Sequence, residues 1–267
     1  LLFIFGSSYQ ALFKPWIGVL ALAVLGYLNP HRYAWSFSRD FPVYLIVFVS
    51  TMIGVMLHKE ERRPFPWTRE TATFLILLGW FTLTTFVSPD VPHAATDQWI
   101  KVMKIYAGVF PTFWVINTHD RFKWLLITIV FSFGLIGIKG GLFAIATGMN
   151  YRVWGPSETF YAGNNEIALA LNMMLPLLLF LAKWASDNKC RILYYGTFVL
   201  SVLSIIATRS RGAFLTLCVV LLTIVLSSKR KWIAVAVLVI GLGIIAPRLP
   251  EAGTVRMGTN LASGDEA

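Results

Sequence analysis

The chain has 267 residues, of which 57% are hydrophobic and 13% charged, and its mean hydropathy is +0.67. This composition lies far outside the range of soluble globular domains and indicates a polytopic membrane protein. The formal net charge is +10, but the basic residues occur in short groups between apolar segments. Because nucleic-acid binding needs basic residues gathered on one soluble face, this pattern excludes a nucleic-acid partner.

Apolar segments follow one another along the whole chain. A bilayer core of about 30 Å needs roughly 17 to 25 helical residues per crossing. In chain order we expect helices at 1–13, 15–28, 41–57, 71–87, 98–116, 124–147, 164–182, 192–207, 212–228 and 232–246. Lys14-Pro15 separates the first two, so residues 1–28 could instead form one kinked helix. Since the segments lack the alternation of barrel strands, we predict an all-α transmembrane helical bundle with about ten spans.

Both ends of the sequence suggest that it is part of a longer protein. It begins with Leu1 instead of methionine, and it stops in the polar run "ASGDEA" soon after an apolar segment. We therefore expect further helices beyond the printed sequence.

Lysine and arginine divide unevenly between the two alternating sets of connections. Of the 23 such residues, thirteen fall in one set, seven in the other and three within expected helices. The larger set comprises Lys14, Lys59, Arg62, Arg63, Arg69, Arg121, Lys123, Lys183, Lys189, Arg191, Lys229, Arg230 and Lys231. The smaller set comprises Arg32, Arg39, Arg152, Arg209, Arg211, Arg248 and Arg256. Because basic residues collect in cytoplasmic loops, we expect the larger set to be cytoplasmic.

Two arginines of the smaller set stand in "TRSRG" (208–212), where topology gives no reason for them. Lys139, in "GIKGG", lies roughly two turns inside the outer end of its helix. Ionisable groups cost at least about 2.5–3.5 kcal/mol at the centre of a membrane helix and are functional candidates by default. Arginine offers a planar fork of donors and lysine a compact charge. We therefore predict that Arg209, Arg211, Lys139 and Arg152 hold a diphosphate headgroup.

The loop before the helix at 164–182 is rich in aromatic and amide side chains. The aromatic residues Tyr151, Trp154, Phe160 and Tyr161 offer flat apolar surfaces for sugar rings. The polar residues Asn164, Asn165 and Glu166 can hydrogen-bond hydroxyl groups. Together with the basic residues they predict an anionic, lipid-linked glycan as the ligand.

These candidates also have structural interpretations. Arg209 could extend its charge to lipid phosphates, and Arg211 could begin a span beside Gly212, which permits close helix approach. Tyr151 and Trp154 could belong to the aromatic belt at the membrane interface. Glu166 and the adjacent asparagines could cap the helix that begins near residue 164.

The remaining ionisable residues carry weaker signals. Lys139 could be neutral or paired with a carbonyl group, and Lys101 and Lys104 could mark one face of an interfacial helix. His93 could be a general base or an ordinary solvated loop residue. The sequence contains no acid pair, metal-ligand cluster, nucleotide-binding glycine loop or Ser/His/Asp set at usable spacing. Its two cysteines predict no disulfide framework, so we expect neither a metal nor a cofactor.

Several stretches resemble one known group of membrane enzymes. "TRSRGAF" (208–214), followed by a span, a short basic turn and another span, resembles the O-antigen ligase and O-antigen polymerase superfamily. The upstream half is similar to the O-glycosylation ligases associated with exosortase systems. The similar stretches are "KPWIGVLALAVLGYLNPHR" (14–32), "PWTRET" (66–71), "KVMKI" (101–105), "GIKGGLFAIATG" (137–148), "YRVWGP" (151–156) and "NNEIALALNMMLP" (164–176).

The resemblance implies an enzyme of the bacterial inner membrane with about twelve helices, of which our ten would be the first. Such enzymes take a glycan from an undecaprenyl diphosphate donor on the periplasmic face. Ligases pass it to a lipid or protein acceptor, and polymerases pass it to another lipid-linked glycan. The resemblance divides the chain into an N-terminal transmembrane region of the ligase branch, 1–190, and the start of the core domain, 191–267.

The resemblance also implies particular site residues. The arginine of the family's "RG" turn matches Arg211, which would contact the donor phosphate. A second arginine and a histidine of the family belong to a large periplasmic loop after the tenth helix. Neither Arg248 nor Arg256 is matched to that arginine, and the histidine has no counterpart here, so the catalytic residue stays unknown.

Three other functions remain open. A polymerase would use the same donor as a ligase. A transporter of the lipid-linked glycan would also place basic residues in its spans, although it would distribute them through the membrane depth. A purely structural membrane subunit would explain the spans but would leave Lys139 unexplained.

Overall fold

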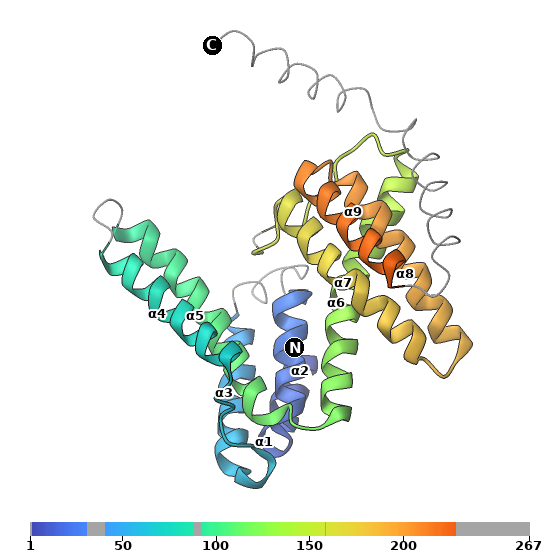
Figure 1. The fold of residues 1–267 in the computed structure, drawn as a ribbon. Helices are drawn as coiled ribbons and strands as arrows, with labels where there is room; N and C mark the ends of the chain where they lie inside the picture. Colours follow the sequence, from blue (N-terminus) through green and yellow to red (C-terminus); the bar gives the residue numbers. More distant parts are fainter. Residues whose placement is uncertain (1, 31–40, 88–91, 158, 228–267) are drawn as a thin grey trace. The chain divides into compact units, whose positions relative to one another are not determined.

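The computed structural model describes residues 2–30, 41–87, 92–157 and 159–227, and of residues 92–95 only the backbone (Figure 1). Every regular element in these ranges is helical, as predicted. The expected span 232–246 lies outside the described residues, as do Arg248 and Arg256. The chain forms two compact units, Leu1–Thr128 and Ile129–Ala267.

The helices follow the expected segments closely. Unit 1 contains α1 (Leu2–Phe13), α2 (Pro15–Tyr27), α3 (Val43–Leu57), the 3-10 helix η3 (Lys59–Glu61), α4 (Arg69–Val87) and α5 (Pro92–Val115). Helix α6 (His119–Ala146) begins in unit 1 and ends in unit 2, which also contains α7 (Asn164–Trp184), α8 (Asn188–Ala207) and α9 (Arg211–Leu226).

Several helices begin earlier than their apolar stretches, because a helix continues into polar residues where a cap is present. The carboxylate of Asp187, for example, accepts a hydrogen bond from the Lys189 amide at 3.2 Å and starts α8.

The expectation of about ten spans is only partly met. Among the described residues, α4, α6, α7 and α8 are the helices long and apolar enough to cross a membrane. The helices α1, α2, α3 and α9 are apolar but have 12 to 16 residues each. Helix α5 has 24 residues, but Asp97, Lys101 and Lys104 lie in its N-terminal and central turns. Apolar composition alone therefore overestimated how many helices have the length of a full crossing.

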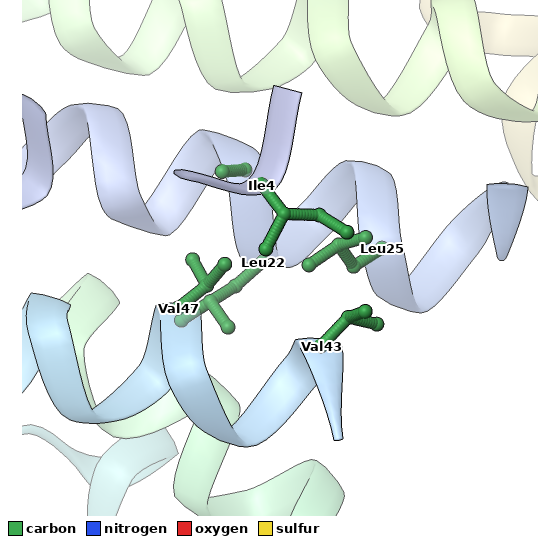
Figure 2. Close-up of a cluster of buried hydrophobic side chains, with 6 residues drawn as sticks. Ile4, Leu22, Leu25, Val43 and Val47 are labelled. Carbon is green, nitrogen blue, oxygen red and sulfur yellow. The ribbon is translucent and has the colours of Figure 1, made fainter. Parts of the chain in front are cut away.

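In unit 1, the first two helices form an antiparallel hairpin, so the alternative of one kinked helix is wrong. The backbone of Lys14 leaves the helical region (φ −132°, ψ 83°), and Pro15 then starts α2. Ile4 of α1 packs with Leu22 and Leu25 of α2, which requires the two helices to run in opposite directions. Figure 2 shows this cluster together with Val47 of α3.

Small residues let α3 approach the hairpin closely. A side chain at Gly54 would overlap the carbonyl oxygen of Ala11, and one at Gly18 would overlap the Thr51 hydroxyl. The Thr51 hydroxyl is buried and donates to the Val47 carbonyl at 2.7 Å. Close contact between small residues is the usual way in which helices associate in membranes.

Three connections meet at one end of unit 1. Arg121 forms a 2.9 Å ion pair with Glu61 and lies 5.9 Å from the ring centre of Trp16. Asn117 donates to the Glu61 carbonyl at 2.8 Å, and the Arg63 amide donates to the Trp114 carbonyl at 3.0 Å. The α1–α2 turn, the α3–α4 connection and the α5–α6 connection therefore share one end, as the alternation of basic loops predicts.

Unit 2 is built around α7. Ile167, Leu171, Leu175 and Leu178 are fully buried on one side of this helix. Helices α8 and α9 pack against α7 (Figure 1). This side repeats every three or four residues, as expected for one face of a helix.

Glycines of α6 face small residues of α8. Gly137 lies against the Ser201 hydroxyl and Gly140 against the Ser204 hydroxyl, and a side chain at Gly141 would overlap the Leu200 carbonyl. These contacts bring the last turns of α6 next to the last turns of α8 and thereby fix the end of unit 2 that carries the candidate site.

Candidate functional site

The two arginines of "TRSRG" lie at the junction of α8 and α9. Residues 208–212, which include the first two residues of α9, are here named the arginine turn. Arg209 adopts a left-handed backbone conformation (φ 53°). Ser210 then caps α9, because its hydroxyl accepts a hydrogen bond from the Ala213 amide at 3.2 Å. Arg211 is the first residue of α9 and its side chain is exposed.

The connection between α6 and α7, residues 147–163, is here named the aromatic loop. Val153 is its anchor, since this side chain is buried against Ala144 of α6 and Ala207 of α8. Further along, the Gly155 amide donates to the Ala162 carbonyl at 3.0 Å, and the Tyr161 ring packs edge-on against Phe133 with 5.6 Å between ring centres. The loop is therefore held near its middle by Val153 and near its C-terminal end by Tyr161.

Hydrogen bonds from three segments fasten the arginine turn and its flanks. The Val153 amide donates to the Ala207 carbonyl at 3.0 Å, and Asn164 of α7 donates to the Thr208 carbonyl at 3.1 Å. The Arg209 guanidinium donates to the carbonyls of Met149 and Asn150 at 2.7 and 2.9 Å. Together these bonds bring the aromatic loop, the start of α7 and the arginine turn to one end of unit 2.

The aromatic loop presents several predicted residues to the surface. Tyr151 is 66% exposed and Trp154 is 59% exposed, and both flank the buried Val153 in sequence. The guanidinium carbon of Arg152 lies 5.6 Å from the centre of the Trp154 ring, within cation–π range. Phe160 is also exposed, whereas Tyr161 is buried and supports the loop from inside.

The two arginines of the turn differ in what their side chains do. Arg209 donates to the backbone carbonyls of Met149 and Asn150, which lie in the aromatic loop just beyond the end of α6. Arg211 projects from the N-terminal end of α9, where the dipole disfavours a positive charge. An anion bound at this position would offset the unfavourable placement of the positive charge.

Lys139 lies away from the seam between α6 and α8. It is exposed, and at 100° per residue it points to the side of α6 opposite Gly137 and Gly141, which face α8. Lys101 and Lys104 are exposed on α5 in unit 1. The side chain of His93 lies outside the described residues. A role for Lys139 in holding a diphosphate stays a prediction.

The amide residues at the start of α7 have separate positions. Gly163 is the N-cap of α7, and no side chain caps it. Asn164 bonds to the arginine turn, whereas Asn165 is exposed on the first turn of the helix. The carboxylate of Glu166 lies against Gly163. Asn165 and Glu166 are therefore placed on the surface beside the arginine turn.

Sequence reasoning missed Asn172 of α7, which bonds to the first turn of α9 next to the arginine turn. It is 1% exposed, and its amide group donates to the Ala168 carbonyl at 3.0 Å and to the Ala213 carbonyl in the first turn of α9 at 3.2 Å. Its Oδ1 atom is buried without a hydrogen-bond partner. The available signal was a lone asparagine within the apolar run "LALNMMLP", where polar groups are costly.

The described residues contain no group of three or more His, Cys, Asp or Glu side chains that could hold a metal ion. The chemistry that the arrangement offers is electrostatic: one exposed guanidinium on a helix N-terminus, a second held by carbonyls, and exposed aromatic rings nearby. Such fixed donors and dipoles suit an anionic group.

Comparison with known proteins gives a family but no function. No curated protein and no solved structure matches the sequence. Residues 1–186 match a family model described as a family of unknown function, DUF5935. The match covers more than half of the 267 residues and ends near the expected boundary at residue 190, which stays a prediction. The chain therefore belongs to the family of unknown function DUF5935.

Proposed function

We propose that this protein is a membrane glycosyltransferase of the O-antigen ligase type. It transfers a glycan from an undecaprenyl diphosphate donor to a lipid or protein acceptor. The arginine turn holds the diphosphate of the donor, and the exposed aromatic loop lies along the sugars.

The observation that carries this proposal is the fastening of the arginine turn beside the aromatic loop. Backbone and side-chain bonds from Val153, Asn164 and Arg209 hold the turn that presents Arg211. A donor group that is held before the ligand arrives needs no reorganisation when charge develops in the transition state. The fixed position of Arg211 therefore supports a role in stabilising a leaving group.

Transfer of a glycan from a lipid diphosphate breaks the bond between the sugar and the diphosphate. Negative charge then grows on the departing phosphate oxygens. The guanidinium of Arg211 offers a bidentate fork to these oxygens. The first amides of α9 add to it, because an anion at a helix N-terminus gains about 0.3–1 kcal/mol.

The aromatic loop supports recognition of the glycan. Tyr151 and Trp154 expose flat rings, and Arg152 stacks near one of them. Asn165 and Glu166 supply hydrogen-bonding groups on the adjacent turn of α7. The general base that would remove a proton from the acceptor hydroxyl is not assigned to any residue of this chain.

The proposal places the helices in a bacterial inner membrane with the arginine turn on the periplasmic face. About ten segments would then lie in the bilayer, with the short helices α1, α2, α3 and α9 held against longer neighbours. The distribution of Lys and Arg, thirteen in one set of connections and seven in the other, supports this orientation.

The test is transfer by purified full-length protein from a synthetic undecaprenyl-diphosphate glycan, measured as release of undecaprenyl diphosphate. Arg211→Ala should lower the rate about a hundredfold or more, as loss of an oxyanion donor does in other enzymes. Arg211→Lys should be intermediate, since lysine keeps the charge and loses the fork. The matched control is Arg191→Ala, an exposed arginine at the other end of α8.

Two outcomes would count against the proposal. If wild-type protein releases no undecaprenyl diphosphate with lipid or protein acceptors, the enzyme assignment is wrong. If Arg211→Ala and Arg191→Ala behave alike, the arginine turn is not the site. A ladder of glycan lengths in the product would identify a polymerase, and movement of intact donor across a vesicle membrane would identify a transporter.

A further inference from the structure

Arg209 uses its side chain within the protein. Its terminal nitrogen Nη2 donates to two consecutive carbonyls, those of Met149 at 2.7 Å and Asn150 at 2.9 Å. These residues follow the last turn of α6 and directly precede Tyr151. The bonds therefore join the arginine turn to the first residues of the aromatic loop.

The backbone at this position does not favour arginine. A left-handed φ of 53° is tolerated best by glycine and next by asparagine. Gly148 and Met149, at the other end of the contact, also have positive φ values of 58° and 63°. Arg209 and Met149 both adopt a backbone conformation that is unfavourable for their residue type. The stabilisation that Arg209 provides must therefore come from its side chain.

The contact lies just beyond the C-terminal end of α6. Met149 and Asn150 follow the last helical residue, Ala146, and the carbonyls of the last turn of α6 accept hydrogen bonds from the amides of Thr147, Gly148 and Met149. The Arg209 guanidinium therefore satisfies carbonyls of the aromatic loop, which it joins to the arginine turn.

We infer that Arg209 is a positioning residue: its guanidinium fastens the aromatic loop to the arginine turn, so that Tyr151 and Trp154 stand beside Arg211. Its effect on the ligand passes through the loop, without direct contact to the phosphate. The consequence for the donor glycan rests on the proposed function, whereas the fastening itself does not.

The fastening is tested by hydrogen–deuterium exchange of the full-length protein in lipid nanodiscs. Arg209→Gly removes the side chain and suits the backbone, so the fold is kept. It should speed exchange of the Val153 amide, which donates to the Ala207 carbonyl, by about tenfold. Arg209→Lys should give a smaller change. Arg211→Ala, the matched control, should leave this amide protected.

The exchange result shows whether Arg209 fastens the aromatic loop, and it does so independently of the reaction that the protein catalyses. Unchanged protection of the Val153 amide in Arg209→Gly would overturn the inference. Equal loss of protection in Arg211→Ala would also overturn it, because the effect would then belong to the turn in general. Amides of α7 around Leu171 serve as the control for global unfolding.

The consequence for the ligand is tested by restoring the fastening without the guanidinium. The variant Arg209→Cys with Asn150→Cys, in a chain lacking Cys190 and Cys218, is joined by a short bismaleimide. The double variant should lose transfer, mainly through a higher KM for the donor. Cross-linking should then restore both KM and transfer. If protection of Val153 returns and transfer does not, Arg209 contacts the ligand itself. If wild-type protein shows no transfer, the proposed function fails and the exchange result stands.

Discussion

At the scale of single residues, the site depends on polar side chains that donate hydrogen bonds to backbone carbonyls. Asn164, Asn172 and Arg209 each donate to carbonyls of a different segment. None of these bonds follows from residue type, because the same asparagine or arginine could face solvent or a ligand. The sequence placed both arginines at the junction of two expected helices, where the structure has them. It did not show that the Arg209 side chain bonds to the aromatic loop whereas the Arg211 side chain is exposed.

Asn172 offers a stability test that does not depend on function. Replacement by alanine removes the bond to the Ala213 carbonyl, so the free energy of unfolding should fall by about 0.5–1.5 kcal/mol. The control is Asn165→Ala on the same helix, where an exposed side chain should change stability by less than about 0.5 kcal/mol. Thermal unfolding in detergent measures both. Equal shifts would show that the buried amide contributes nothing particular.

At the scale of helices, most elements were predictable and their contacts were not. Apolar runs located α1 to α9, because a long apolar segment in lipid has to be helical. The glycines of "GIKGG" were noted only as neighbours of Lys139. In the structure Gly137, Gly140 and Gly141 are the surface against which α8 packs. Hydrophobicity does not show which face of a membrane helix packs against another helix, because lipid tails and protein interiors are equally apolar.

The seam between α6 and α8 predicts opposite effects for two similar substitutions. Gly141→Ala should destabilise unit 2, because the new methyl group would meet the Leu200 carbonyl. Gly196→Ala should be neutral or stabilising by up to about 1 kcal/mol, since nothing lies near it and alanine is the better helix former. Thermal unfolding of the two variants decides the point. A loss of stability in Gly196→Ala equal to that in Gly141→Ala would contradict the packing described.

At the scale of the whole molecule, the alternation of basic connections agrees with the ends that each unit defines. In unit 1 the connections near Trp16, Glu61 and Asn117 share one end. In unit 2 the aromatic loop and the arginine turn share one end, opposite the α7–α8 connection. The proposed membrane orientation rests on charge counts that can be read from the sequence, whereas the hydrogen bonds within each end can be seen only in the coordinates.

Orientation can be measured with two cysteines of unit 2. The native Cys190 is exposed in the first turn of α8, and Tyr151→Cys would be exposed roughly 25 Å away along that helix. In intact spheroplasts, a maleimide that does not cross membranes should label Tyr151→Cys and leave Cys190 unlabelled until lysis. Labelling of Cys190 before lysis would reverse the proposed orientation.

The most direct test of the central claim is the affinity of the protein in nanodiscs for undecaprenyl diphosphate, the product of the proposed transfer. If the arginine turn holds the diphosphate, Arg211→Ala should weaken binding about tenfold or more, as expected for loss of a hydrogen bond to a charged group. Arg191→Ala should bind like wild type. Equal affinities for wild-type protein and Arg211→Ala would contradict the account, because the arginine would then serve only to begin α9.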